Sequence, residues 1–302
     1  MIITVLVQTF YLKEWGFVTE SFRVEKVLNN NVLIASHPTY DEVVLLGKGI
    51  GFGKKKGDYI EQSAVEKCFI LRNEREQEQY KKLLPELDEE FIGLMNEVIQ
   101  HIKQRVNVPL NEHIHVALTD HISFTLKRLK KGLDLKNPFL VETKSLYPLE
   151  YEIACEVIDM INRRLGVKLP EGEAGFIALH IHSAISKHSL SEVNQHSQLI
   201  AQLVQIVEQQ LHISIDRNSI HYLRFIRHLR YAIERIKKGE KVEEPKKLSK
   251  ILKDAYPLCY NLAWKLIKVM QQALQMPVDE AEAVYLTMHL QRLAKKETET
   301  TK

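Results

Sequence analysis

The sequence predicts an α+β multidomain protein, in which a small antiparallel β-sheet domain precedes two tandem all-α helical bundles. Three features predict this architecture: short alternating apolar segments between residues 22 and 71, helical apolar spacing beyond Pro85, and a long internal repeat. At 302 residues, the chain is also longer than one hydrophobic core of ordinary size requires. We therefore expect two or three domains.

The sheet is predicted from about four short segments that are rich in β-branched residues. They read RVEKVL, VLIA, EVVLLG and FIL, and turn signals separate them, among them Asn29, Asn30, Asn31 and the pair His37-Pro38. A sheet of about 50 residues buries little apolar surface by itself. A second copy of the chain would complete its core, so the sequence predicts a homodimer.

The helical part of the chain is one module present twice. Tyr147-Pro148 recurs as Tyr256-Pro257, at an offset of 109 positions. The apolar positions of the helix that follows also recur, with Ile153, Ala154, Val157, Ile158, Ile161 and Leu165 matching Leu262, Ala263, Leu266, Ile267, Met270 and Leu274. Further pairs are Glu173 with Glu282 at the same offset, and Arg128 with Arg235 and Gly132 with Gly239 at an offset of 107. Such a long period indicates a duplicated domain, with a boundary near residues 187 to 195.

Composition narrows the class of protein. A net charge of +3 is too small to imply nucleic acid or an anionic membrane by itself, so any basic surface must be local. Cys68, Cys155 and Cys259 lack CxxC or metal-finger spacing and are expected as reduced, buried thiols. The N-terminal run lacks the basic segment and cleavage site of a signal peptide, and no later run approaches the ~20 apolar residues of a membrane span. We expect a cytoplasmic protein.

The repeat separates two pairs of histidines from the 13 in the chain. His121 falls on His228 and His180 falls on His289, whereas His113, His115 and His182 have no histidine opposite them. Most single histidines are hydrogen-bonded core or surface residues. A metal site would need further ligands, and no HExxH helix is present. Hydrolytic catalysis would need a nucleophile motif such as GxSxG, which is also absent. A ring nitrogen can also accept a phosphoryl group, which adds about −1.5 to −2 charges.

The neighbours of the paired histidines differ. Asp120 precedes His121 and would orient its ring or repel a phosphate. Arg227 precedes His228 and belongs to a run with Arg224 and Arg230, which would attract a phosphate. This difference allows the two copies to respond oppositely.

Four alternating glycines, Gly47, Gly49, Gly51 and Gly53, form the other candidate site. In an extended strand they would share one face, where a nucleic-acid backbone can approach closely. Phe52 would stack on a base, Lys48 and Lys54 to Lys56 would meet phosphates, and Asn29 to Asn31 would contact base edges, a combination that suits single-stranded or looped RNA. The alternative is a flexible hairpin with a solvated lysine cluster. Neither GxxxxGK[ST] nor GxGxxG is present.

Several motifs together resemble the BglG/SacY family of transcriptional antiterminators, with its glucose-operon members the nearest. They are KVLNNNVLIA, GKGIGFGKKKGD, LTDH, LPEGEAGFIALHIHSA, YLRFIRHLR and YLTMHL, spread over about residues 22 to 296. The resemblance implies a co-antiterminator RNA-binding domain at 21–77 and two phosphotransferase-system regulation domains (PRDs) at 78–187 and 188–298. Residues 1–20 precede the usual start of the family and are either an upstream extension or a mis-assigned start.

The resemblance also implies site residues and partners. The RNA face would comprise Lys26, Asn29, Asn31, Gly47, Lys48, Gly49 and Phe52, with Lys48 where some relatives carry arginine. The phosphoacceptors would be His121, His180, His228 and His289, the four that the repeat selects. The implied partners are a leader mRNA hairpin, a sugar permease acting on the first PRD, and the phosphocarrier protein HPr acting on the second. Such a protein is a non-enzymatic switch without cofactor or metal.

Two other classes of function remain open from the sequence. A DNA-binding activator with the same regulatory modules would need a helix-turn-helix before the repeats, where residues 22–71 instead show strand patterns. A metal-dependent hydrolase would use the paired histidines as ligands, and metal analysis would test it.

Overall fold

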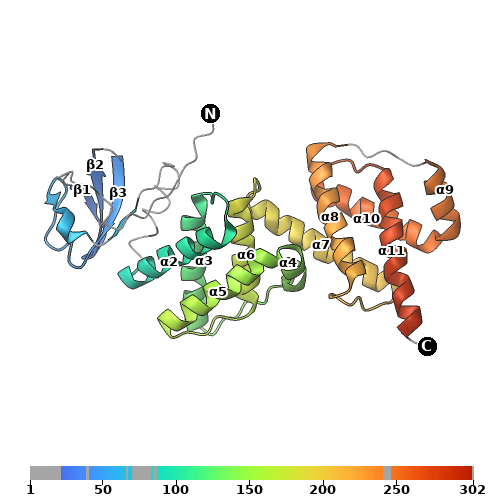
Figure 1. The fold of residues 1–302 in the computed structure, drawn as a ribbon, viewed down its shortest axis with the longest axis horizontal. Coiled ribbons are helices and arrows are strands. Elements are labelled where there is room, and N and C mark those ends of the chain that lie inside the picture. The colour runs from blue at the N-terminus through green and yellow to red at the C-terminus, as the bar shows by residue number, and fades with distance from the viewer. Residues whose placement is uncertain are drawn as a thin grey trace. The chain divides into compact units, whose positions relative to one another are not determined.

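The computed structural model describes residues 22–38, 41–65, 67–69, 83, 87–240 and 246–300 (Figure 1). The described residues form two compact units, one of those up to residue 135 with 153–170 and 184–187, the other of those in 136–152, 171–183 and from 188 onward. Residues 1–20, predicted as a separate N-terminal segment, lie outside the described part.

The N-terminal domain is one antiparallel sheet in the strand order β4-β1-β2-β3-β5, which confirms the predicted fold of this region. Its strands are β1 (Phe22–Val27), β2 (Val32–His37), β3 (Asp41–Leu46), β4 (Tyr59–Ile60) and β5 (Lys67–Phe69). Only β4 was not predicted, because two residues are too few to show alternation. Apolar side chains of β1, β2 and β3, among them Val24, Leu33 and Leu45, form the domain's buried core.

The glycine segment is not a strand, so that part of the prediction is wrong. Residues 47–53 form successive tight turns, with Ile50 N donating to Gly47 O at 3.1 Å and Phe52 N donating to Gly49 O at 3.0 Å. Gly49 and Gly53 both have φ near +70°, a left-handed backbone that reverses the chain and favours glycine. The glycines recur because the turns repeat, and they do not share one face.

From residue 87 onward, the described part of the chain repeats the same five helices in the same order. The first copy has α2 (Glu89–Val106), α3 (His113–Lys130), α4 (Leu140–Leu146), α5 (Pro148–Leu165) and α6 (Gly172–Ile185). The second has α7 (Leu190–Leu211), α8 (Ile220–Lys238), α9 (Lys246–Ala255), α10 (Pro257–Leu274) and α11 (Ala281–Thr300). Helices α5 and α10 begin at the matched prolines, because proline's fixed φ and missing N–H suit a first helical position. Most of their matched apolar positions are buried, and Leu165 and Leu274 are partly so.

In the second copy, α11 packs against α8 and α10, and α10 also packs against α7. The apolar faces of these helices form one buried cluster, which includes Phe225, Leu229 and Leu290. Helix α8 ends at Gly239, whose left-handed conformation (φ 67°) lets its N–H reach the last helical carbonyls. This packing holds α8 and α11, the helices that carry His228 and His289, against each other.

The cysteines were expected to be buried, and this is wrong for Cys155. Cys68 and Cys259 are buried, whereas Cys155 is exposed, and none of these three described residues is in a disulfide. Cys155 lies on α5 beside, not within, the apolar stripe of Ile153, Ala154 and Val157. Burial raises the pKa of Cys68 to about 12. Within the described residues, no helix is long and apolar enough to cross a membrane.

Candidate functional site

Two loops of the sheet domain are joined into one surface by the predicted RNA-binding residues. The backbone carbonyl of Asn31 accepts a hydrogen bond from Gly47 N (3.1 Å), and its Oδ1 accepts one from Gly49 N (2.7 Å). Asn29 Oδ1 accepts from Asn31 N at 2.9 Å. The Asn31 carbonyl and side-chain oxygen therefore hold the two loops together, and the Asn29 side chain fixes the conformation of the first loop. The side-chain NH2 groups of Asn29 and Asn31 remain as donors toward a base edge.

Two glycines of this surface are packed against the protein's own backbone. A Cβ on Gly47 would lie 2.2 Å from Ala64 O, and one on Gly51 would lie 2.3 Å from Asn29 O. Both distances are far below van der Waals contact. Gly49 and Gly53, in contrast, have open space where a Cβ would stand. Close approach by another backbone therefore explains Gly47 and Gly51, but that backbone belongs to this chain.

We expect Gly51→Ala to destabilise the sheet domain more than Gly53→Ala. The methyl group at Gly51 forces the loop away from Asn29 and costs about 2 kcal/mol of unfolding free energy. At Gly53 only the left-handed backbone is penalised, by about 1 kcal/mol. Chemical denaturation of the two variants measures the difference, and equal losses would contradict this account of the loop.

The exposed groups of the surface are aromatic and basic. The Phe52 side chain is 75% exposed, and Lys26 and Lys48 are also exposed. The neighbouring lysine cluster is partly engaged, since Lys54 Nζ donates to Tyr59 O at 3.2 Å and Lys56 Nζ lies 3.0 Å from Glu25 Oε2. The hydrogen bond from Lys56 lowers the pKa of Glu25. A large apolar ring at the tip of a basic loop suits a stacked base beside phosphates.

The second copy brings its two selected histidines together. His228 on α8 and His289 on α11 have ring centroids 4.8 Å apart, with the ring planes inclined at 33°. In the first copy, His121 lies on α3 and is partly exposed, and His180 lies on α6 and is 8% exposed. The four residues remain predictions as phosphoacceptors.

A buried carboxylate lies beside the pair in the second copy. Glu282 Oε2 is 3.1 Å from His228 Nε2, at ion-pair distance but without the alignment of a hydrogen bond. Arg235 Nη2 donates to Glu282 Oε1 at 2.6 Å. Burial raises the pKa of Glu282, but the contacts with His228 and Arg235 outweigh it and lower the pKa overall. The carboxylate is therefore charged and holds one edge of the His228 ring.

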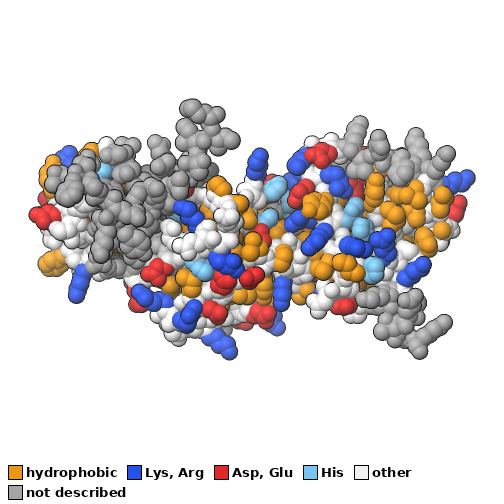
Figure 2. Space-filling model, in the orientation of Figure 1, with side chains coloured by type: hydrophobic (Ala, Val, Ile, Leu, Met, Phe, Trp, Pro, Cys, Tyr) orange, Lys and Arg blue, Asp and Glu red, His pale blue; other side chains and the backbone are white. Residues whose placement is uncertain are grey.

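The environment of His289 favours its neutral form. Burial, together with the charges of His228, Arg292 and Arg224, lowers its pKa to about 4. Basic side chains lie on the surface over α8 (Figure 2). A neutral imidazole keeps the ring lone pair with which it attacks a phosphoryl group, and nearby guanidinium groups stabilise the added charge.

Sequence reasoning assigned no role to Glu282 and Arg235, although the repeat carried the signal. Both recur in the first copy, as Glu173 and Arg128. The three arginines of the predicted run have different surroundings in the structure. Arg230 Nη1 donates to Leu146 O at 3.4 Å, whereas Arg224 and Arg227 are exposed.

Histidines without a counterpart in the repeat contact other side chains or are buried in the fold. His182 Nδ1 is 2.8 Å from Glu150 Oε1, and the centroid of its ring is 4.0 Å from that of the Tyr147 ring. His115 is buried on α3. In the described part of the chain, no group of three or more His, Cys, Asp or Glu residues is placed to hold a metal ion.

Stability is expected to fall between pH 6.5 and 4. Burial lowers the pKa of His115, His196 and His289 to about 4, so the unfolded chain binds protons in this range that the folded chain does not. The stabilisation is complete above pH 6.5 and is lost as the pH falls, by on the order of 1 kcal/mol per histidine at pH 5. Thermal unfolding of His115→Gln should depend less on pH than wild type. His212→Asn, at an exposed histidine, is the control; equal slopes for wild type and His115→Gln would contradict the assignment.

Comparison with known proteins identifies both parts of the chain. The CAT RNA binding domain matches residues 22–78, and the PRD domain matches twice, at residues 96–184 and 201–293. The chain belongs to the BglG/SacY family of antiterminators. The double match confirms the internal duplication. Both PRD matches fall inside the predicted limits 78–187 and 188–298, which stay predictions.

Two antiterminators align with nearly the whole chain. The PtsGHI operon antiterminator of Bacillus subtilis (strain 168) is 63% identical over 276 residues, 91% of this chain and 98% of that protein. The GlcA/glcB genes antiterminator of Staphylococcus carnosus (strain TM300) is 42% identical over 93% of this chain and 99% of its own length. A crystal structure of GlcT CAT-PRDI is 65% identical and covers 55% of this chain and 99% of that one, with a TM-score of 0.47.

Proposed function

We propose that this chain is a transcriptional antiterminator of a glucose phosphotransferase-system operon. It binds an RNA hairpin in the leader transcript, stabilises it, and so prevents the overlapping terminator hairpin from forming. The observation that carries the proposal is the match to a CAT RNA binding domain followed by two PRD domains, in a chain 63% identical to a PtsGHI operon antiterminator. In this role the chain is a switch and not an enzyme.

The sheet domain supplies the chemistry that a looped RNA requires. Phe52 offers a stacking face, the amides of Asn29 and Asn31 offer donors to base edges, and Lys26 and Lys48 offer charge to phosphates. The hydrogen bonds between the two loops preorganise these groups, which reduces the entropy lost on binding. A homodimer would present this surface twice.

The PRD domains supply the control. A sugar permease would phosphorylate His121 and His180 when sugar is absent and inactivate the protein, and HPr would modify His228 and His289 in the second PRD. The contacts of His228 with Glu282, and the pKa of His289 lowered to about 4, support a reactive pair there. Charge added among packed helices can change how they pack.

Transcription in vitro tests the proposal with the full chain. A template carries the leader of the adjacent permease gene, and terminated and read-through transcripts are measured with and without the purified protein. We expect read-through to rise with protein concentration on the native leader and to stay low on a leader whose hairpin pairing is destroyed. Binding to duplex DNA upstream of the promoter, with unchanged read-through, would instead support the DNA-binding alternative.

A further inference from the structure

The short helix α4 of the first PRD packs on the second PRD. It contacts α7 and α8, and Leu146 and Tyr147 belong to the same buried apolar cluster as Leu203, Phe225 and Leu229 of the second copy. Leu179 on α6 belongs to this cluster as well. Residues 136–152 and 171–183 therefore lie in one compact unit with the second PRD, although their sequence belongs to the first.

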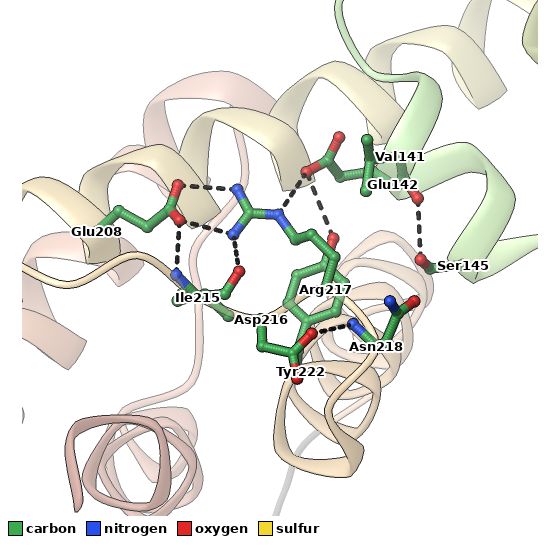
Figure 3. A network of polar contacts seen from close by, with 9 residues as sticks. All are labelled: Val141, Glu142, Ser145, Glu208, Ile215, Asp216, Arg217, Asn218 and Tyr222. Atoms are coloured by element: carbon green, nitrogen blue, oxygen red, sulfur yellow. Dashed lines mark hydrogen bonds and ion pairs between the residues drawn. The ribbon is translucent and has the colours of Figure 1, made fainter. Parts of the chain in front are cut away.

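A polar network centred on Arg217 fixes this junction (Figure 3). The guanidinium donates to both carboxylate oxygens of Glu208 at the end of α7, at 2.6 and 2.8 Å. Its Nε lies 3.9 Å from Oε1 of Glu142 on α4. The same Glu142 oxygen accepts a hydrogen bond from Tyr222 Oη at 3.4 Å, and the Tyr222 ring lies 5.2 Å from the guanidinium carbon. One arginine thus connects α4, α7 and the first turn of α8.

Loss of Arg217 would be costly, because the α4 carboxylate of the network and the tyrosine that donates to it are shielded from water. Glu142 is 6% exposed and Tyr222 is fully buried. Burial raises the pKa of Tyr222, so its hydroxyl remains a donor to Glu142. The hydrogen bond from Arg217 lowers the pKa of Glu208. Without Arg217 a buried carboxylate on α4 would have no cation of this network opposite it, which favours release of the helix.

The network is specific to the junction and is not a feature of the repeated fold. At the offset of 107, Arg217 matches Leu110 and Tyr222 matches His115. An apolar residue and a buried histidine in the first copy cannot form the same contacts. The five-helix module therefore does not require this network in order to fold.

We propose that Arg217 locks α4 of the first PRD onto the second PRD, so that the second PRD responds to phosphorylation of the first. The signalling part rests on the proposed function. His180 is 8% exposed and directly follows Leu179, which packs in the shared cluster. A phosphoryl group there adds about −1.5 to −2 charges to a nearly dry position and displaces α6 from that cluster. The contacts of Arg217 with Glu142 and Glu208 keep α4 attached to the second PRD during this displacement.

Hydrogen exchange of the full chain tests the lock. In Arg217→Gln we expect the amides of residues 140–146 to exchange about tenfold faster than in wild type. The milder Glu142→Gln should give a smaller increase, and the double variant should exchange no faster than Arg217→Gln alone, because both act on one network. Arg164→Gln is the matched control, since Arg164 pairs with Glu90 at 3.4 Å on an exposed surface. Unchanged exchange of α4 in Arg217→Gln would overturn the proposal.

A reporter for read-through in cells tests the signal. Arg217→Gln is expected to be partly active without sugar, whereas Arg164→Gln remains fully repressed. A variant with faster α4 exchange but normal repression would overturn the signalling role. If the wild-type chain itself gave no read-through, the proposed function would fail, while hydrogen exchange would still decide whether Arg217 locks the junction.

Discussion

Phe52→Ala is expected to weaken binding of the leader hairpin about ten- to a hundredfold, because a base stacked on an aromatic ring contributes ~1–3 kcal/mol. The ring is 75% exposed, so its removal leaves no cavity and should leave unfolding free energy nearly unchanged. Titration of a labelled hairpin at fixed salt measures the loss. The salt concentration must be held constant, since phosphate contacts also depend on it.

Tyr59→Ala provides the matched control for Phe52. Tyr59 is also a large exposed aromatic residue, at 62%, but it lies on the edge strand β4 outside the loops joined by Asn31. We expect this variant to bind the hairpin within about twofold of wild type, as for a substitution outside the contact. An equal loss in both variants would indicate nonspecific stacking, and no loss in Phe52→Ala would remove the ring from the interface.

The sheet domain shows where sequence periodicity is informative and where it misleads. Alternation is clear in β1, where Phe22 and Val24 are buried and Arg23 is exposed. Strands β2 and β3 were identified by short runs of β-branched and apolar residues, and consecutive residues of both strands are buried. The same period of two among the glycines did not mean a strand. Gly49 and Gly53 are selected by positive φ, and Gly47 and Gly51 by close backbone contact, and neither cause is visible in an apolar pattern. Extended glycines and a series of turns therefore have the same sequence signature.

The helical domains were easier to predict because the chain contains its own comparison. The repeat located the paired helices and selected His228 and His289, which the structure places 4.8 Å apart between ring centroids. The junction was not predictable in this way, because Arg217 and Glu142 act where the copies differ. Contacts that link two modules leave no trace in the sequence features that the modules share.

The double variant His121→Ala, His180→Ala is expected to make read-through independent of sugar. In the proposed function, a permease phosphorylates these two histidines and so inactivates the protein. Without them, activity without sugar should rise by about ten- to a hundredfold, the usual range of such coupling. A reporter behind the native leader measures it, with and without glucose. His113→Ala is the control, since His113 also lies on α3 but has no counterpart in the second copy.

The corresponding double variant of the second PRD, His228→Ala with His289→Ala, decides whether the copies differ in role. Here removal of the rings also leaves buried Glu282 with Arg235 as its remaining ion-pair partner, so unfolding free energy must be measured alongside activity. If the first PRD alone carries the repressing signal, this variant stays off without sugar. Constitutive activity in this variant, with normal repression in His121→Ala, His180→Ala, would assign the inactivating phosphorylation to the second PRD instead.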